Sequence, residues 1–257
     1  MKIAIITGAS SGLGVEFTKA IISRYQYLDE IWIVARRKKR LENIAQSYLN
    51  IKIRVIPLDL SDDTSYDELN RILIETKPDI KILINNAGLD INGRFDTMEV
   101  GDIINMVNIN IKGMTVVNRL CFPHMKKGSF AIITGSVSSF VPVASQAVYS
   151  SSKIYVKFLA QALREEVKEK GINVCLLCPG NMDTEMNIRS EAKVQKKKVA
   201  RLPYLDVKML TVKALQKAES GKSIYTPGAF YKSYRLLGKL FPASFMMKFT
   251  KNFFNAD

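Results

Sequence analysis

The sequence predicts an α/β protein, a single Rossmann-type domain in which helices flank both faces of a doubly wound parallel sheet. Short runs rich in isoleucine, valine and leucine alternate with longer segments of helical periodicity. Most of these runs are continuously apolar, which indicates strands buried on both faces. Repeated alternation of strand and helix favours parallel strands joined by right-handed crossovers. A length of 257 residues without an internal repeat or a Pro/Gly linker suits one domain.

The expected elements follow each other in order along the chain. Strands are predicted at 2–7, 30–35, 52–57, 80–85, 129–135 and 172–178, with a short one at 223–226. Helices are predicted at 13–26, 38–49, 64–76, 98–120, 149–169 and 206–219. Residues 183–201 are polar and basic, and we expect them to form a helix and loop over the carboxyl edge of the sheet.

Composition narrows the class of protein. The 38 basic against 24 acidic residues give a net charge of +14, which suits nucleic acid, an anionic membrane or an anionic substrate. Because basic residues occur in every segment, a soluble protein with a lysine-rich surface is favoured and no nucleic-acid partner is expected. Three cysteines do not resemble a disulfide framework. No signal peptide or apolar stretch of ~20 residues is evident, so a cytoplasmic location is expected.

The turn after the first strand has the composition of a phosphate-binding site. Residues 7–14 read Thr-Gly-Ala-Ser-Ser-Gly-Leu-Gly and lead into a helical pattern. A helix N-terminus presents unpaired N–H groups and a positive dipole end, and glycines let the backbone approach a phosphate. The spacing differs from the common G-x-G-x-x-G, but its place between strand and helix favours a nucleotide. The candidate contacts are Gly8, Ser10, Ser11, Gly12, Leu13 and Gly14.

Two arginines follow the second predicted strand. In dinucleotide-binding folds an acidic residue here binds the ribose 2′-hydroxyl, whereas a basic one accommodates a 2′-phosphate. Arg36 and Arg37 stand there without a neighbouring carboxylate, and guanidinium groups match a phosphate dianion. The basic residues at 38–40 are interpreted as the solvated start of a helix. NADP(H) is therefore expected in preference to NAD(H).

Polar residues also stand near the ends of the fourth and fifth strands. The fourth ends in Asn-Asn-Ala-Gly at 85–88, which suits either packing under an adenosine or a simple turn. Ser136 lies just past the fifth strand, and Tyr149 and Lys153 share one face of the helix that follows. A phenol of pKa ~10 is a poor acid or base at neutral pH, but a nearby cation favours its ionised form.

Together these motifs resemble the classical short-chain dehydrogenase/reductase family over residues 1–226. The resemblance rests on six motifs in the family's order, none specific alone: the T-G-x-x-x-G-x-G turn, Asn-Asn-Ala-Gly at 85–88, Asn110 within Asn-Ile-Asn-Ile-Lys-Gly, Ser136, Tyr149-Ser-Ser-Ser-Lys153, and Pro-Gly-Asn-Met-Asp-Thr at 179–184. The resemblance implies a Rossmann fold and hydride transfer between a nicotinamide ring and a small-molecule carbonyl or alcohol.

It also implies roles for four catalytic residues. Tyr149 would be the general acid in reduction and the general base in oxidation. Lys153 would lower the pKa of Tyr149 and hold the nicotinamide ribose. Ser136 would polarise and position the substrate carbonyl, and Asn110 would help to hold a water in the proton relay.

Cofactor contacts outside the glycine turn follow from the same resemblance. Asp59 would meet the adenine edge, while Met182 and Thr184 would orient the carboxamide. NADP-type members place a basic residue where Arg36 or Arg37 stands, and many carry another just before the second glycine, where this chain has Ser11. The remaining expected contacts are Leu60, Asn86, Ala87, Gly88, Tyr149, Lys153, Pro179 and Gly180.

Other chemistries are not favoured. His124 is the sole histidine, and no G-x-S-x-G turn accompanies it, so neither a metal site nor a hydrolase is expected. Cys175 and Cys178 fall within a predicted buried strand and are interpreted as small core residues.

The expected substrate is an apolar ketone or alcohol, such as a steroid or lipid-like compound, because the end of the chain is rich in methionine and aromatic residues. One alternative is a 3-oxoacyl thioester reductase, whose acidic carrier would meet the basic residues at 193–201. Another, from a different class, is a nucleotide-binding sensor or scaffold without turnover. Residues 1–182 are expected to form the cofactor-binding and catalytic core, 183–222 the substrate loop and helices, and 228–257 a tail.

The tail admits two interpretations. Phenylalanines recur every four residues among lysines, a pattern found in segments that lie on an anionic membrane or pack within a protein. Pro242 interrupts any continuous helix, so peripheral membrane contact through residues 228–254 is not favoured. The family resemblance implies a homodimer or homotetramer with helix 149–169 at an interface. The phenylalanines are Phe241, Phe245, Phe249 and Phe253.

Overall fold

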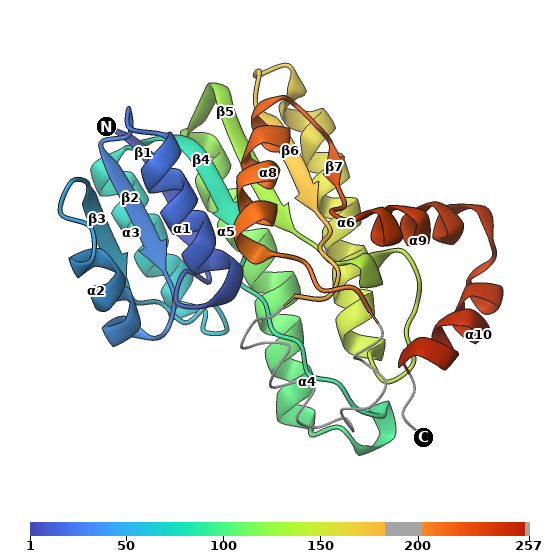
Figure 1. Ribbon diagram of the computed structural model, residues 1–257. Helices are drawn as coiled ribbons and strands as arrows, with labels where there is room; N and C mark the ends of the chain where they lie inside the picture. Colours follow the sequence, from blue (N-terminus) through green and yellow to red (C-terminus); the bar gives the residue numbers. More distant parts are fainter. Residues whose placement is uncertain (183–201, 255–257) are drawn as a thin grey trace.

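A computed structural model describes residues 1–182 and 202–254, with side chains to residue 248. Its strands form one sheet in the order β3-β2-β1-β4-β5-β6-β7, and every neighbouring pair is parallel (Figure 1). The strands are β1 (Lys2–Thr7), β2 (Glu30–Val34), β3 (Lys52–Ile56), β4 (Asp79–Asn85), β5 (Met125–Thr134), β6 (Asn173–Leu177) and β7 (Ile224–Tyr225). This is the predicted doubly wound Rossmann-type sheet.

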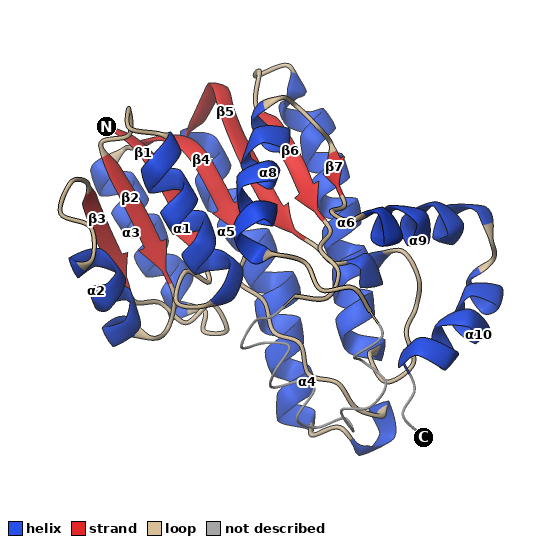
Figure 2. Ribbon diagram, viewed as in Figure 1, coloured by secondary structure: helices blue, strands red, loops and turns tan. Residues whose placement is uncertain are grey.

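Helices cover both faces of the sheet (Figure 2). Alternate residues of each strand explain this arrangement: Ile3 and Ile5 of β1 pack on one side and Ala4 and Ile6 on the other. The layer on the side of Ile5 is built by α3 (Thr64–Thr76), α5 (Met114–Cys121) and α6 (Ala147–Lys168). The opposite layer is built by α1 (Gly12–Arg24), α2 (Lys38–Gln46) and α8 (Val207–Glu219). Continuous apolar runs are required because both faces are buried.

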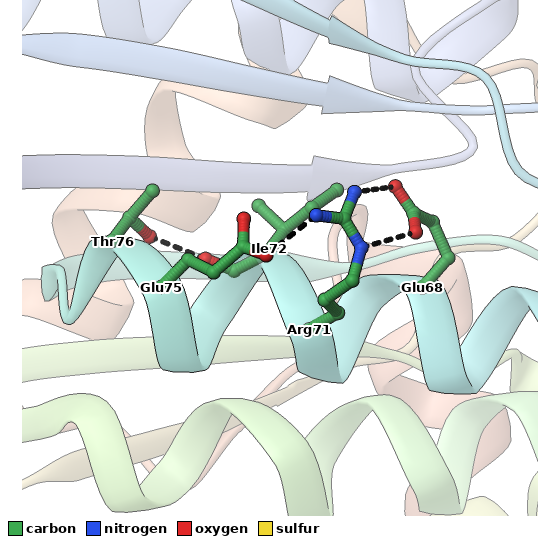
Figure 3. Close-up of polar contacts among 5 residues, drawn as sticks. All are labelled: Glu68, Arg71, Ile72, Glu75 and Thr76. Atoms are coloured by element: carbon green, nitrogen blue, oxygen red, sulfur yellow. Dashed lines mark hydrogen bonds and ion pairs between the residues drawn. The ribbon is translucent and has the colours of Figure 1, made fainter.

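The exposed face of α3 carries ion pairs that contribute little to the stability of the fold. Arg71 forms ion pairs with Glu68 at 2.7 Å and Glu75 at 2.6 Å, one turn away on either side (Figure 3). These side chains are exposed, and water screens such pairs, so they add little stability. The opposite face of the helix, with Leu69 and Leu73, is fully buried and holds α3 on the sheet.

The predicted helix at 98–120 differs in detail from the structure. It divides into α4 (Val100–Val107), a π-helical turn η2 (Asn108–Gly113) and α5. The turn carries Asn110, whose side chain is bonded to neighbouring segments, and π turns commonly occur at functional sites. The chain remains helical through the turn, so its apolar periodicity gave no sign of the change.

Other expectations concern element boundaries. Strand β5 begins at Met125 rather than 129, because Met125 already pairs with Ile80 of β4. Cys175 and Cys178 are buried free cysteines, as expected of core residues. The predicted helix and loop at 183–201 lies outside the described residues.

Two helices at the end of the chain extend beyond the β7 edge of the sheet (Figure 1). They are α9 (Ala229–Leu240) and α10 (Ala243–Phe254), and the break between them falls at Pro242, as predicted. Tyr231 and Tyr234 of α9 are buried against the loop after β5, so α9 packs on its own domain. Over residues 1–182 and 202–254, no helix has the length and apolar character needed to cross a membrane.

Candidate active site

The order of the strands reverses beside β1, whose neighbours are β2 and β4. In open parallel sheets, ligands bind in the crevice outside the carboxyl ends of the strands at such a point. One hydroxyl ties the two strand ends together there: Thr7 Oγ1 accepts hydrogen bonds from the backbone N–H groups of Asn86 at 2.9 Å and Ala87 at 3.0 Å. The Asn86 side chain donates to the carbonyl of Thr7 at 3.2 Å and accepts from Thr134 at 3.3 Å. These bonds fix the floor of the crevice.

The glycine turn brings the first helix against the end of β1. Gly8 has a φ of 65°, a conformation that disfavours residues with a Cβ. A Cβ on Gly14 would lie 2.2 Å from the carbonyl oxygen of Gly8, so helix and turn meet at a distance that only glycine permits. The first turn of α1 holds no acidic residue, and Ser11 forms no side-chain cap. The N–H of Gly14 donates to the carbonyl of Ser11 at 3.2 Å, so the N–H groups of Gly12 and Leu13 are the ones available for an anion.

Both arginines after β2 lie at this end of the crevice. Arg37 donates hydrogen bonds from Nε to Ser10 Oγ at 3.0 Å and from Nη2 to Ser11 Oγ at 2.7 Å. Arg36 pairs with Asp59 at 3.5 Å. Burial opposes ionisation of Asp59, but hydrogen bonds from Ser61 and the charge of Arg36 outweigh it and lower the pKa of Asp59. A carboxylate and two guanidinium groups therefore stand charged beside the glycine turn.

A cavity of about 380 Å³ connects this charged end with the helix that carries Tyr149. Eighteen of the expected site residues line it: Gly8, Ser10, Ser11, Gly12, Leu13, Arg36, Arg37, Asp59, Leu60, Asn86, Ala87, Gly88, Ser136, Tyr149, Lys153, Pro179, Gly180 and Met182. Gly14 and Asn110 are not part of its wall; Gly14 packs beneath the turn and Asn110 behind Leu89. Thr184 lies outside the described residues.

Tyr149 and Lys153 occupy the first turns of α6 at the far end of the cavity. Lys153 Nζ donates to the carbonyl of Thr134 at 3.1 Å and lies 5.6 Å from the centroid of the Tyr149 ring. Ser136, two residues after the end of β5, accepts a hydrogen bond from the N–H of Ser138 at 3.1 Å and is close enough to Tyr149 to act on its pKa. The structure thus brings three of the expected catalytic side chains together.

The pKa of Tyr149 lies above its ordinary value. Burial raises it and the charge of Asp90 adds to the rise, while the hydrogen bond with Ser136 opposes both. Burial also lowers the pKa of Lys153 to about 8, with Asp90 opposing. Lys153 is not among the causes of the shift at Tyr149, and the expected lowering of the Tyr149 pKa by Lys153 stays a prediction.

Asn110 acts as a clamp on the segment after β4. Its Oδ1 accepts from the N–H of Leu89 at 2.8 Å, and its Nδ2 donates to the carbonyl of Leu89 at 2.8 Å and to Ser152 Oγ at 3.1 Å. Ser152 lies on α6 next to Lys153. The π turn thus joins the wall of the cavity to the helix that carries the tyrosine.

Residues 2–195 match the family model described as short chain dehydrogenase, which is well over half of the chain. The chain belongs to the short-chain dehydrogenase family. A short-chain dehydrogenase is an oxidoreductase, and the expected fold and reaction class are thereby confirmed.

Relatives of this short-chain dehydrogenase agree. An uncharacterized oxidoreductase of Staphylococcus epidermidis is 32% identical over 187 residues, which cover 72% of this chain and 80% of the relative. A bulky-bulky ketone specific alcohol dehydrogenase from Comamonas testosteroni is 26% identical with a TM-score of 0.75, over 96% of this chain and 94% of that one. A short-chain dehydrogenase from Sphingobium yanoikuyae shares the fold at 24% identity and a TM-score of 0.78, over 100% and 99%.

The sequence did not point to several residues that line the cavity of this dehydrogenase. Tyr231 of α9 is one: its hydroxyl accepts from the N–H of Asn181 at 3.0 Å and donates to the carbonyl of Pro203 at 2.7 Å. A Cβ on Gly180 would lie 2.1 Å from the Tyr231 ring, so the ring packs directly on that glycine. Asp90 is another, and its position just after the Asn-Asn-Ala-Gly motif was a signal that could have drawn attention to it.

Proposed function

We propose that this short-chain dehydrogenase uses NADP(H) to interconvert a ketone or aldehyde with an alcohol, with Tyr149 as the acid and base. One observation carries the proposal. A single cavity joins a glycine turn flanked by arginines to a cluster of Ser136, Tyr149 and Lys153. A dinucleotide needs an anion site at one end and a reactive site at the other, and this cavity offers both.

The residues present fit such a cofactor along its length. The N–H groups at the start of α1 and the glycine turn would bind the pyrophosphate, and Arg36 and Arg37 would bind the 2′-phosphate. Asp59 would accept from the adenine edge, and Lys153 would donate to the nicotinamide ribose. When bound, the cofactor supplies or accepts the hydride. The remaining contacts would come from Leu60, the turn at 86–88, and Pro179, Gly180, Met182 and Thr184.

The chain's own part in the reaction is to hold the substrate oxygen and exchange one proton with it. Ser136 would donate a hydrogen bond to that oxygen, and Tyr149 would deliver the proton in reduction. Burial keeps Tyr149 in the protonated form that an acid requires. Asn110 would act through Leu89 and Ser152, which position the cavity wall and α6, and through the proposed water of the proton relay.

An apolar ketone is the substrate best supported. Apolar side chains form part of the cavity wall: Val143, Met182, Leu202 and the Tyr231 ring. The Comamonas relative is specific for bulky-bulky ketones, which are large on both sides of the carbonyl. The alternative of a 3-oxoacyl thioester reductase relies on basic residues at 193–201, which lie outside the described part of the chain.

Oxidation of NADPH and NADH by the purified protein tests the proposal. The panel contains steroid ketones, aryl ketones, sugar ketones and 3-oxoacyl thioesters, with Tyr149→Phe as the matched variant. Removal of the proton donor is expected to lower kcat at least ~100-fold while NADPH binding, followed by its fluorescence, persists. Turnover that survives in Tyr149→Phe, or tight NADPH binding without turnover of any ketone, would overturn the catalytic assignment. The latter result would favour a nucleotide-binding sensor.

A further inference from the structure

The end of the cavity near Tyr149 contains a carboxyl group with one oxygen that nothing in the described part of the chain satisfies. Asp90 lines the cavity two residues after Gly88, and its Oδ1 is enclosed without a hydrogen-bond partner. Asn92, two residues further along the same wall, has an Oδ1 in the same condition. Two enclosed acceptor oxygens on one wall are costly for a folded protein unless a ligand supplies donors.

Asp90 has no structural role that would explain its burial. Lys153 is close enough for each charge to act on the pKa of the other, yet no ion pair joins them, and Lys153 donates instead to Thr134. The position of Asp90 is nevertheless fixed, because Asn110 clamps the neighbouring Leu89 through both its N–H and its carbonyl. A fixed, enclosed and unsatisfied carboxyl beside Tyr149 is positioned for a ligand.

The charged groups around Asp90 indicate which kind of ligand group can bind beside it. The described groups that act on it, or that it acts on, are the Lys153 ammonium and the Tyr149 phenol. Because the charges of Asp90 and Lys153 are opposite and close together, their effects on a charged substrate group largely cancel, and neither an anion nor a cation is favoured. A neutral hydroxyl donates to the carboxylate without adding charge, and hydrogen bonds to charged groups are among the stronger ones.

We propose that Asp90 determines substrate specificity by accepting a hydrogen bond from a hydroxyl group beside the reacting carbon. The substrate class is then an apolar hydroxy ketone or the corresponding diol, with Asn92 as a second contact. This inference rests on the proposed function, because it names the substrate of the same site. It disfavours a 3-oxoacyl thioester, which brings no hydroxyl donor in its keto form and would leave Asp90 unsatisfied.

Three matched ketones test the inference: 2-hydroxyacetophenone, 2-methoxyacetophenone and acetophenone. The methoxy compound has the same electron-withdrawing oxygen beside the carbonyl but lacks the donor. The wild type is expected to reduce the hydroxy ketone with a kcat/KM roughly 10–100-fold above that of the methoxy ketone. Asp90→Leu is expected to bring the ratio close to one, by slowing the hydroxy ketone and accelerating the methoxy ketone. Asp90→Asn, which retains a neutral acceptor, is expected to give an intermediate ratio.

Controls separate this inference from the proposed function. Asp96→Asn removes an exposed carboxyl of the same segment, paired with Arg94, and should leave the ratio as in the wild type. Equal kcat/KM values for the hydroxy and methoxy ketones in the wild type overturn the inference while Tyr149-dependent turnover still supports the function. An Asp90→Leu variant that keeps the ratio but binds NADPH about tenfold more weakly assigns Asp90 to the cofactor and also overturns it. No turnover of any ketone overturns both.

Discussion

Arg37 gives the glycine turn a positive charge that the turn itself lacks. The family resemblance implies a basic residue just before the second glycine of an NADP-type turn, where this chain has Ser11. In the structure the guanidinium of Arg37 reaches from the end of β2 and bonds to Ser11 and Ser10. A charge from the second strand therefore stands where the first turn offers only a hydroxyl.

The Arg37→Ala variant is expected to raise the KM for NADPH roughly 10–100-fold and to change that for NADH little. The reason is that a charge-assisted bond to the 2′-phosphate is lost, and NADH has no such phosphate. Steady-state kinetics with both cofactors measures the change, and Arg71→Ala on the exposed face of α3 is the control. An equal loss with both cofactors would mean that Arg37 only supports the turn.

The burial of Asp90 predicts how the free energy of unfolding depends on pH. Burial raises its pKa to about 7, although Lys153 opposes the rise. Between pH ~4 and 7 the folded protein thus holds a proton that the unfolded chain has released, so stability from this group falls as the pH rises. Asp90→Asn lacks this loss. The free energy of unfolding of Asp90→Asn minus that of the wild type should therefore increase between pH 5 and pH 8, by on the order of 2 kcal/mol.

Chemical denaturation of both proteins without cofactor at the two pH values measures this difference. Lys153 adds to the difference in the same direction, because its pKa falls further without the Asp90 charge and the unfolded chain then binds the extra proton. A difference between the proteins that does not change with pH would show that Asp90 titrates in its ordinary range.

At the scale of elements, the packing of α1 on the end of β1 depends on a missing side chain. A Cβ on Gly14 would meet the carbonyl oxygen of Gly8 at 2.2 Å, and backbone on both sides leaves no room to adjust. Gly14→Ala is expected to displace the start of α1 and weaken NADPH binding at least ~10-fold. Fluorescence titration with NADPH measures the loss.

The same substitution in α4 is the matched control. A Cβ on Gly101 would meet nothing within 4 Å, so Gly101→Ala should leave NADPH binding unchanged. It should also stabilise the protein by about 0.5–1 kcal/mol, because alanine is the better helix former. Unchanged binding in Gly14→Ala would show that the turn tolerates a shift of the helix.

The type of an element could be predicted from the sequence wherever a local pattern of residues was sufficient to determine it. Continuous apolar runs identified the main strands, and Pro242 placed the break between α9 and α10. The π turn was missed because the extra residue is stabilised by bonds from Asn110 to Leu89 and Ser152, which are 21 and 42 residues away. Long-range bonds of this kind leave no periodic trace in the chain.

The site was predictable to a similar extent, for the same reason. Motifs adjacent in sequence, such as the glycine turn and Tyr149 with Lys153, pointed to residues that line one cavity in the structure. Tyr231 was missed because its contact with Gly180 joins residues 51 positions apart, from 180 to 231. Asp90 was passed over because a single acidic residue in a loop has no distinctive spacing, and its place just after the Asn-Asn-Ala-Gly motif does not show that its Oδ1 is enclosed.

At the scale of the whole molecule, apolar side chains remain exposed on two adjacent helices. On α6, Ile154 and Phe158 are 42% and 62% exposed and lie one turn apart, and on the neighbouring α4, Val100 and Ile104 are 68% and 52% exposed. Such surfaces mark protein interfaces. We therefore propose the homodimer or homotetramer implied by the family resemblance, with this surface at the interface.

Phe158→Glu is expected to shift the protein toward a monomer at micromolar concentration, because a charge cannot be desolvated there without a partner. Light scattering after size-exclusion chromatography measures the mass. Phe241→Glu, at an exposed position of the tail, is the comparison. Dissociation by Phe241→Glu alone would place the interface on the tail instead.

The contact between Tyr231 and Gly180 makes the end of the chain a participant in ligand binding. The Tyr231 hydroxyl accepts from the N–H of Asn181 and donates to the carbonyl of Pro203. This one hydroxyl therefore joins α9 to the loop after β6 and to the segment before α8. By linkage, a ligand that fixes residues 180–182 must strengthen the attachment of α9. A change that loosens α9 must weaken the binding of that ligand by the same free energy. The attachment of α9 and ligand binding at residues 180–182 are therefore coupled equilibria.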